Sequence, residues 1–395
     1  MPSGRDVVIQ SRPMVFGLTA CLASLLAGAA GAPPPVLPAE TSDVATLPPA
    51  NPHRFFTIGF RGSFVIFDGD SGKLEGQVPV GGYSNIALSP DNSRIYIAET
   101  LWSHGNRGKR MDLLSIYDGT TLNLLKEIDL PGRALVTPKL NDLTLSASGK
   151  RAYVYNMQPA ASVFWVDLVR QSVGGTAEVP GCALTFPWGE SGVSSLCSDG
   201  SLAMVTFPDQ GAPKVTHTKP FFDAAADPIF DNSVYDGATG TAVFLSYTGR
   251  IYTAKLGAEP VIQKPWSINE AAGQKAAGTG TDELAWRPGG VQPIAWHRAS
   301  DRIFVLMHPG SYWSHHDAGT EIWVLNLKTH ALLARYPVRA KPENSVRSIV
   351  VSQQAQPQLY LLNPDGGDSV VNADTGEELR KIEYAAGEAA VVANF

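Results

Sequence analysis

A strand–turn–strand unit that recurs along the chain is the feature that most constrains its fold. The clearest copy lies in residues 63–98. Its first two strands, 64–67 and 74–80, flank a run of residues that tolerate left-handed backbone, 68–72, and so predict a β-hairpin. Two further apolar strands follow, separated by a Ser-Pro-Asp-Asn-Ser turn at 89–93. We interpret the four strands as one antiparallel meander, which can bury its apolar face only against a neighbouring copy.

The hairpin recurs at a spacing of about fifty residues, a period typical of β-propellers. Its seven copies begin near residues 63, 113, 162, 200, 249, 321 and 368. The sequence therefore predicts an all-β fold, a seven-bladed β-propeller of four-stranded antiparallel blades over residues 53–395. The alternative is a large β-sandwich or two stacked all-β domains, but sandwiches seldom repeat one Asp-x-x-(Thr/Ser)-Gly turn at near-constant spacing.

Charge and composition argue against a nucleic-acid partner. Charged residues make up 17% of the chain, the net charge is -6, and no basic stripe with interleaved aromatic residues occurs. Because nucleic-acid binding depends on neutralising phosphates with Lys and Arg, we expect no such partner. An apolar share of 44% is ample for packing between blades.

The first 32 residues have the pattern of a secretory signal peptide. Arg5 and Arg12 precede an apolar run at 15–26, and small residues follow at 27–32. We expect cleavage near residues 29–32 and export to the periplasm. The apolar run is too short for a permanent membrane span, so no stable span is expected.

Two features lie beside this signal. Residues 18–21 resemble a lipoprotein cleavage box, but the apolar stretch before Cys21 is short and continues beyond it, which argues against lipidation. Residues 33–52 form a Pro- and Ala-rich arm with few large apolar side chains. Such an arm is expected to be poorly ordered or to lie across a partner.

Two cysteines remain after the signal peptide, Cys182 and Cys197. In an exported chain such a pair most often forms a disulfide, so we predict one. The residues between them show little β pattern. A metal or redox pair is the alternative, but the spacing and the lack of nearby histidines argue against it.

Residue patterns for catalysis or metal binding on this chain are scarce. His308 with His315 and His316 makes the one histidine cluster of the sequence, and it falls in a segment that reads as a loop, so we interpret these as exposed loop histidines. No nucleophile elbow, zinc-protease motif or phosphate loop occurs. Aspartates recur directly after strands, where a turn-capping role is expected. They are Asp68, Asp118, Asp167 and Asp374.

Six short runs, in order along nearly the whole chain after the signal peptide, carry a family resemblance. They are residues 107–112, 197–202, 215–218, 247–251, 286–290 and 297–303. With the cysteine pair they resemble the heavy chain of quinoprotein amine dehydrogenases, methylamine dehydrogenase first and aromatic amine dehydrogenase next. The resemblance implies a periplasmic seven-bladed propeller paired with a small light chain in an assembly of two heavy and two light chains.

The resemblance also implies where the chemistry lies. In that family the light chain carries the tryptophan tryptophylquinone cofactor and the catalytic carboxylate, a primary amine becomes an aldehyde and ammonia, and electrons pass to a copper protein such as amicyanin. No catalytic, cofactor-binding or metal-binding residue is therefore expected on this chain. An aromatic residue of the first propeller loop narrows the substrate channel in the family, and Phe60 is the candidate here. The preferred amine, methylamine or an aromatic one, is left open.

A polar insertion between two strands, residues 103–110, is a candidate contact with the light chain. Its backbone groups and positive charges would be stranded if buried, so it must project from a propeller face. Arg107 and Arg110 are the candidate contact residues. The alternative is an ordinary solvated connection.

Two readings outside this family remain open. One is a stand-alone exported propeller that binds a ligand or protein without a redox partner. The other is a lactonase-like propeller with a central calcium ion, although the chain shows no evident set of inward Glu and Asn residues at the starts of the repeats.

Overall fold

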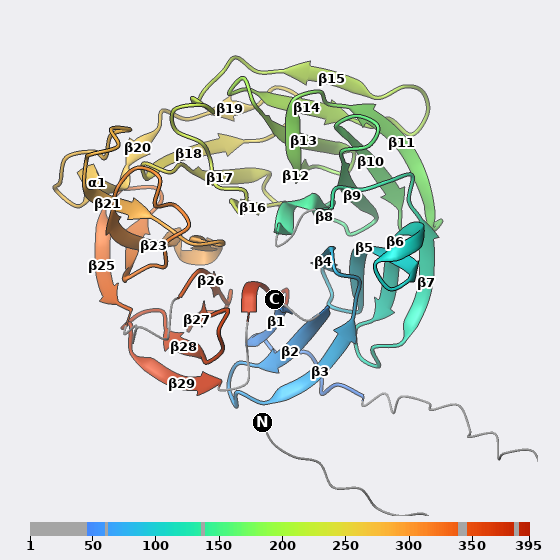
Figure 1. Ribbon diagram of the computed structural model, residues 1–395, viewed down its shortest axis with the longest axis horizontal. Coiled ribbons are helices and arrows are strands. Elements are labelled where there is room, and N and C mark those ends of the chain that lie inside the picture. The colour runs from blue at the N-terminus through green and yellow to red at the C-terminus, as the bar shows by residue number, and fades with distance from the viewer. Residues whose placement is uncertain (1–45, 60–61, 136–138, 339–345, 383–386) are drawn as a thin grey trace, which may run out of the picture. The chain divides into compact units, whose positions relative to one another are not determined.

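The repeated strands pair into seven antiparallel sheets that surround a common axis, and the predicted seven-bladed propeller is confirmed (Figure 1). This is seen in a computed structural model that describes residues 46–59, 62–135, 139–338, 346–382 and 387–395. The predicted signal peptide lies outside the described residues, as do Phe60 and residues 33–45 of the predicted arm. No helix in the described part of the chain is both long and apolar enough to cross a membrane.

Each blade consists of strands that run outward from the axis. Blade 1 holds β30 (Gly387–Val392), β1 (Arg54–Gly59), β2 (Ser63–Asp68) and β3 (Leu74–Pro79). Blade 2 holds β4 (Ser84–Leu88), β5 (Arg94–His104), β6 (Arg107–Asp118) and β7 (Leu124–Asp129). Blade 3 holds β8 (Leu143–Leu145), β9 (Arg151–Asn156), β10 (Ser162–Asp167) and β11 (Ser172–Glu178), and the 3-10 helix η1 (Leu140–Asp142) precedes it. Blade 4 holds β12 (Cys182–Trp188), β13 (Gly192–Cys197), β14 (Leu202–Thr206) and β15 (Lys214–His217).

The remaining blades follow the same plan with additions. Blade 5 holds β16 (Val234–Asp236), β17 (Thr241–Leu245) and β18 (Arg250–Lys255), with β19 (Val261–Ile262) and β20 (Trp266–Ser267) both paired to β18. Blade 6 holds β21 (Ala285–Pro288) and β22 (Ile294–His297), both paired to β23 (Arg302–Gly310), then β24 (Glu321–Asn326) and β25 (Leu332–Pro337). Blade 7 holds β26 (Ser348–Val351), β27 (Gln358–Leu362), β28 (Asp368–Asn372) and β29 (Glu378–Ile382). The short helices α1 (Ile268–Ala271) and η2 (Arg298–Ser300) lie before β21 and after β22.

The phase of the repeat differs from the prediction. The four strands predicted as one meander in residues 63–98 are divided between two blades, because β2 and β3 close blade 1 while β4 and β5 open blade 2. The recurring hairpin is the outer pair of strands in every blade. It recurs so clearly because its tight turn leaves a sequence signal, whereas the connection from one blade to the next varies in length.

The turns of the outer hairpins share one geometry. In the turn after β2, Asp68 Oδ1 accepts the N–H of Asp70 at 3.0 Å, and the N–H of Gly72 returns to the Asp68 carbonyl at 2.8 Å. Gly72 has a φ of 69°, the left-handed conformation that glycine adopts without strain. Asp118 and Asp167 cap their turns in the same way.

The predicted cap Asp374 is wrong. In that turn Asn372 accepts the N–H of Asp374, and the Asp374 carboxylate instead pairs with Arg302 at 2.5 Å. Asparagine offers the same short side-chain oxygen as aspartate, so either residue can cap this turn.

Seven apolar clusters, one between each pair of neighbouring blades, form the core. Phe56 of β1 packs towards blade 2 with Phe64, while its neighbour Phe55 packs towards blade 7 against Tyr360, with ring centroids 4.3 Å apart. Successive side chains of a strand point to opposite faces of the sheet, so a strand enclosed by two neighbouring blades must be apolar on both faces. This explains why the inner strands are runs of apolar residues.

The ring closes where the two ends of the described chain meet. β30, from the end of the chain, pairs with β1 and becomes the innermost strand of blade 1. The N–H of Asn394 donates to Asn92 Oδ1 at 2.8 Å and the Asn92 amide donates back to the Asn394 carbonyl, which ties the last residues to blade 2. Blade 1 thus needs strands from both ends of the propeller.

The cysteine pair lies in a β-hairpin, which the sequence did not predict. Cys182 of β12 stands directly opposite Cys197 of β13, with Cα atoms 3.9 Å apart, and the two are joined by a disulfide. The predicted disulfide is therefore confirmed. The β pattern was missed because the hairpin contains Pro187 and its register shifts between Ala183 and Phe186.

The last part of the predicted arm lies on the propeller. The N–H of Leu47 donates to the Thr120 carbonyl at 2.7 Å, and its side chain is buried in the cluster between blades 1 and 2. The Arg54 guanidinium holds the Pro48 carbonyl at 2.7 Å and pairs with Glu75. The ordered contacts of the propeller therefore begin before residue 53.

We predict that replacing both cysteines, Cys182→Ser with Cys197→Ser, lowers the free energy of unfolding by about 3 kcal/mol, because the loop that they close is lost from the unfolded chain. Denaturant titration of the oxidised protein and the double variant measures this. Ser195→Ala, which removes a single buried hydrogen bond to the Leu184 carbonyl in the same hairpin, is the control and is expected to cost about 1 kcal/mol. Equal stability of the double variant and the oxidised protein would contradict the prediction.

Candidate functional site

The two faces of the propeller carry different connections. On one, here called the turn face, lie the five-residue turns of the outer hairpins and the connections from first to second strands. On the other, here called the loop face, lie the connections between blades and those from second to third strands, because the strands alternate in direction. The loop face receives the longer connections, including residues 218–233 and 268–284.

The predicted contact segment is a projecting hairpin on the loop face. β5 and β6 stay paired as far as His104 and Arg107, well beyond the last partner of β6 in β7. Residues 103–109 are exposed, as expected of a projecting insertion. The segment is paired as strands, whereas the sequence predicted a loop.

The two predicted contact arginines have different surroundings. The Arg110 guanidinium is engaged within the chain. It donates to Asp112 at 3.0 Å, to Gln158 at 2.9 Å and to the carbonyl of Arg133 at 3.2 Å, which ties the hairpin to blade 3. Arg107 is exposed, and no side-chain contact of its guanidinium occurs among the described residues. Arg107 is the one left available to another molecule, and contact of either arginine with a partner stays a prediction.

Beneath the hairpin lies a buried arginine that organises the junction of blades 2 and 3. The Arg133 side chain is fully buried and donates to the Tyr83 carbonyl at 2.6 Å, to Thr100 at 3.1 Å and to Asn85 Oδ1. Burial lowers the pKa of Arg133 to about 10, so it remains a cation at neutral pH. Above it, the exposed ring of Tyr83 meets Trp102 edge-on, with centroids 6.5 Å apart.

A buried carboxylate faces this arginine. Asp142, in η1, is 2% exposed, and neither of its oxygens has a hydrogen-bond partner among the described residues. Burial raises the pKa of Asp142 to about 7, although the positive charges of Lys139 and Arg133 oppose the rise. Asp368 in blade 7 behaves alike, since burial raises its pKa to about 7. Both groups therefore change charge near neutral pH.

The histidine cluster is not a set of exposed loop residues, so that prediction is wrong for two of the three. His308 is buried in β23 and hydrogen-bonds to Ser314 at 2.8 Å. His315 stacks on Tyr247, with ring centroids 4.0 Å apart, and only His316 is exposed. Burial lowers the pKa of both His308 and His315, so they pack as neutral rings on the loop face.

Phe60, the predicted channel residue, cannot be placed. β1 ends at Gly59 and β2 begins at Ser63, on the loop face, and Phe60 lies between them, outside the described residues.

Potential metal ligands gather once in the described residues, where Cys182, Cys197 and His217 come within 4.8 Å of one another. Both sulfur atoms of this group belong to the disulfide. A disulfide sulfur carries no thiolate charge, so the group is a poor metal site.

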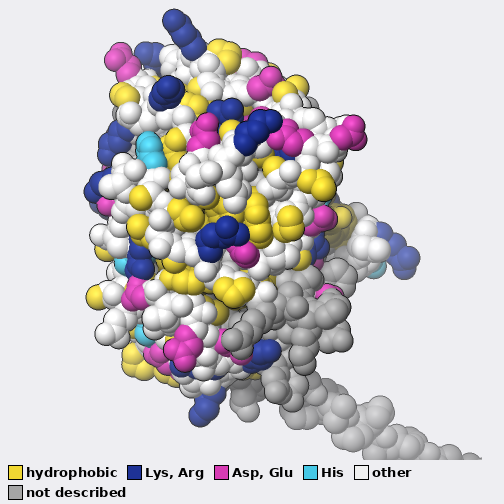
Figure 2. Space-filling model, turned by 90° about the vertical axis from the view of Figure 1, so that its left-hand side faces the viewer, with side chains coloured by type: hydrophobic (Ala, Val, Ile, Leu, Met, Phe, Trp, Pro, Cys, Tyr) yellow, Lys and Arg dark blue, Asp and Glu magenta, His cyan; other side chains and the backbone are white. Residues whose placement is uncertain are grey.

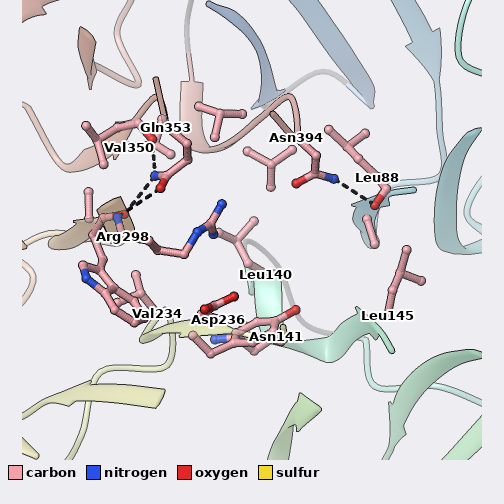
Figure 3. Close-up of a pocket in the computed structure, with 18 of the residues that line it drawn as sticks. Leu88, Leu140, Asn141, Leu145, Val234, Asp236, Arg298, Val350, Gln353 and Asn394 are labelled. Atoms are coloured by element: carbon pink, nitrogen blue, oxygen red, sulfur yellow. Dashed lines mark hydrogen bonds between the residues drawn. The ribbon is translucent and has the colours of Figure 1, made fainter. Parts of the chain in front are cut away.

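A cavity of about 670 Å³ lies on the propeller axis and is lined by six of the seven blades (Figure 3). Its walls are apolar side chains of the inner strands, among them Leu88, Leu145 and Val350. Two charged side chains line it, Asp236 and Arg298. These follow inner strands β16 and β22 or end them, so the charges lie towards the turn face.

The cavity is closed towards the loop face by hydrogen bonds across the axis. From η1, the Asn141 amide donates to the carbonyls of Asp231 at 3.1 Å and Ser233 at 3.0 Å. Lys139, just before η1, pairs with the Asp231 carboxylate at 2.5 Å. Thr185 of β12 donates to the Asn141 carbonyl at 2.7 Å, so η1 covers the inner strand of blade 4.

Sequence reasoning missed both Arg298 and the η1 floor. Arg298 falls in one of the runs that carry the family resemblance, but its direction depends on where β22 ends. The signal for η1 was the length of the connection between β7 and β8, which exceeds that of the neighbouring β3–β4 and β11–β12 connections.

The outer surface carries no strong field of one sign on the side that can be inspected. Figure 2 shows the side of the propeller with blades 5 and 6, where basic and acidic side chains are interspersed among apolar ones. This distribution agrees with the expectation that nucleic acid is not a partner.

Comparison with known proteins identifies sequence and structural relatives. The family described as methylamine dehydrogenase heavy chain matches residues 50–394. The chain is 30% identical over 352 residues to the methylamine dehydrogenase heavy chain of Methylobacillus flagellatus, covering 88% of this chain and 84% of that one. It is 32% identical over 353 residues to the heavy chain of Paracoccus versutus, covering 89% and 79%. The β-propeller domain of Cps50 (Swd1) from Myceliophteria thermophila superposes with a TM-score of 0.52 at 9% identity, covering 82% and 94%, which shows the fold alone.

We predict that Arg110→Ala lowers the free energy of unfolding of the chain by about 1–2 kcal/mol, because it leaves Asp112 and a backbone carbonyl without their donor. Arg107→Ala, two strand positions closer to the tip, is the matched control and should leave the melting temperature unchanged. Thermal unfolding of both variants tests this. A stability loss for Arg107→Ala equal to that for Arg110→Ala would show that the whole hairpin, and not this one tie, is stabilising.

The buried carboxylates predict the sign of the pH dependence. A carboxyl whose pKa is raised in the folded state stabilises the fold below its unfolded pKa of about 4, and this contribution is lost as the pH rises to about 7. The melting temperature should therefore gain a falling component between pH 5 and pH 8 that is smaller in Asp142→Asn. Asp129→Asn, on the exposed side of β7, is the control and should follow the unmodified chain. Curves for Asp142→Asn and the unmodified chain that run parallel would contradict the assignment.

Proposed function

The chain belongs to the methylamine dehydrogenase heavy chain family, and on this basis we propose that it is the large subunit of a periplasmic amine dehydrogenase. The complex would oxidise a primary amine to an aldehyde and ammonia. The family match over residues 50–394 carries the proposal, because it takes in all seven blades. The names of the relatives favour methylamine as the substrate.

The proposal places the tryptophan tryptophylquinone cofactor on a small light chain, where it would take electrons from the amine and release them to a copper protein such as amicyanin. The tryptophans of this chain have structural roles where they meet. Trp286 and Trp323 have ring centroids 5.4 Å apart, but Trp323 is fully buried and its indole N–H donates to Glu321 at 2.8 Å. An amine has no access to that ring, which supports a cofactor on the partner.

The work of this chain would then be to hold and enclose the light chain, in an assembly of two heavy and two light chains. The loop face offers the features that suit a docking surface. Its projecting hairpin carries Arg107 and Lys109, both exposed. Beside the hairpin lie two exposed apolar side chains, Tyr83 at 41% and Met157 at 53%. Aromatic anchors with a basic rim are typical of protein interfaces.

The first test is isolation of the affinity-tagged chain from its source cells grown on methylamine. We expect it to co-purify from the periplasmic fraction with a small cysteine-rich chain, and the complex to absorb as a quinone and reduce a dye with methylamine. The isolated chain should do neither. A chain that is recovered alone from such cells, with no partner and no activity, would favour the alternative of a stand-alone exported propeller.

The second test concerns the hairpin. We predict that replacing Arg107 and Lys109 together with Ala weakens binding of the light chain about tenfold, chiefly through faster dissociation at low salt, while the melting temperature of the isolated chain is unchanged. Surface plasmon resonance or analytical ultracentrifugation measures the affinity. Arg170→Ala, at an 82% exposed arginine in a hairpin turn on the turn face, is the control. Unchanged affinity in the double variant would assign the hairpin to solvent.

A further inference from the structure

The axial cavity is a blind pocket that opens on the turn face. Its floor is η1 with residues 231–233, joined across the axis by the hydrogen bonds of Asn141. A second set of bonds closes the floor on the opposite side, where Gln292 donates to the Ala390 carbonyl at 3.2 Å and accepts the Ala390 N–H at 2.9 Å. A volume of about 670 Å³ lies within the range of small-molecule sites.

Arg298 supplies the pocket with unused hydrogen-bond donors. Its backbone N–H is fixed by Gln353 Oε1 at 3.1 Å, and the Gln353 amide is fixed in turn by the Trp296 carbonyl at 2.9 Å. Figure 3 shows its guanidinium reaching toward the middle of the cavity. Within the described residues, no hydrogen bond or ion pair engages that guanidinium. A planar fork of free donors is held at the pocket by an anchored backbone.

The other charged side chain of the lining is already satisfied. Asp236 accepts the N–H of Ala238 at 3.1 Å and the hydroxyl of Thr239 at 2.6 Å, which is the turn-capping role that aspartate has in the outer hairpins. It therefore offers little to a ligand, and the free recognition capacity of the pocket is cationic. Because the guanidinium geometry matches a carboxylate, the expected ligand group is a carboxylate.

The walls define the rest of the ligand. Leu88, Leu145, Val234 and Val350 line the pocket around Arg298, and burial of apolar surface against them is favourable (Figure 3). We propose that the axial cavity binds a small organic carboxylate with an apolar or aromatic body, with Arg298 as its anion ligand. This inference does not depend on the amine dehydrogenase proposal, because the pocket opens on the face away from the projecting hairpin.

Benzoate is a suitable probe, with benzyl alcohol as a neutral analogue of the same size. Isothermal titration calorimetry of the full chain should detect benzoate binding and weaker binding of benzyl alcohol. Arg298→Gln should weaken benzoate binding about tenfold or more, while leaving the affinity for benzyl alcohol nearly unchanged. Arg170→Gln, at an exposed arginine away from the cavity, should bind benzoate as the unmodified chain does.

A second variant guards against a folding defect in the first. Ala147 lines the cavity from an exposed position, so Ala147→Trp should narrow the pocket without disturbing a strand and should weaken both probes. Circular dichroism and the melting temperature establish that each variant is folded. Equal benzoate affinity in Arg298→Gln and the unmodified chain, or no benzoate binding to the unmodified chain at millimolar concentration, would overturn the proposal.

Discussion

Packing between neighbouring blades is the interaction on which the rest of this structure depends. No blade has a core of its own, since each of the seven apolar clusters forms between two blades. Phe55 and Phe56 show the consequence in one strand, because adjacent side chains enter clusters on opposite sides of blade 1. A blade is stable only when both neighbours are present, so the ring must close. Closure is achieved by β30, and the reciprocal hydrogen bonds of Asn92 and Asn394 reinforce it.

Local chemistry made this architecture predictable from the sequence. The outer hairpins were recognisable because their turns need a short capping side chain and a residue in the left-handed conformation, and Asp68 and Gly72 are typical of that need. The phase was wrong because the strongest local signal, a tight turn, marks the outer edge of a blade and not its beginning. The axis-facing strands β8 and β16, three residues each, carry almost no signal, and only the pairing of the sheets shows where a blade starts.

Tertiary surroundings decide what the polar side chains do, and this is why the candidate site was predicted less well than the fold. Arg107 and Arg110 lie in one basic run of the sequence, yet one is exposed and the other is held by Asp112 and Gln158. The two partners differ in origin: Asp112 is local, whereas Gln158 arrives from blade 3. His308 was assigned to a loop because Pro309 and Gly310 follow it, but β23 continues through both residues by pairing with β21. In each case the deciding contact is distant in sequence.

The η1 floor divides the propeller into two functional halves. Cross-axis bonds from Asn141 and Lys139 to Asp231 separate the loop face, where the docking features lie, from the cavity that holds Arg298. A molecule bound in that cavity would not reach a partner docked on the loop face, and any influence between them would pass through η1 itself. η1 is also the element that contains Asp142, a buried carboxylate without hydrogen-bond partners in the described chain. The same short helix therefore closes the cavity, faces the buried Arg133 below the hairpin and changes charge near neutral pH, which makes it the one element through which the two halves can be coupled.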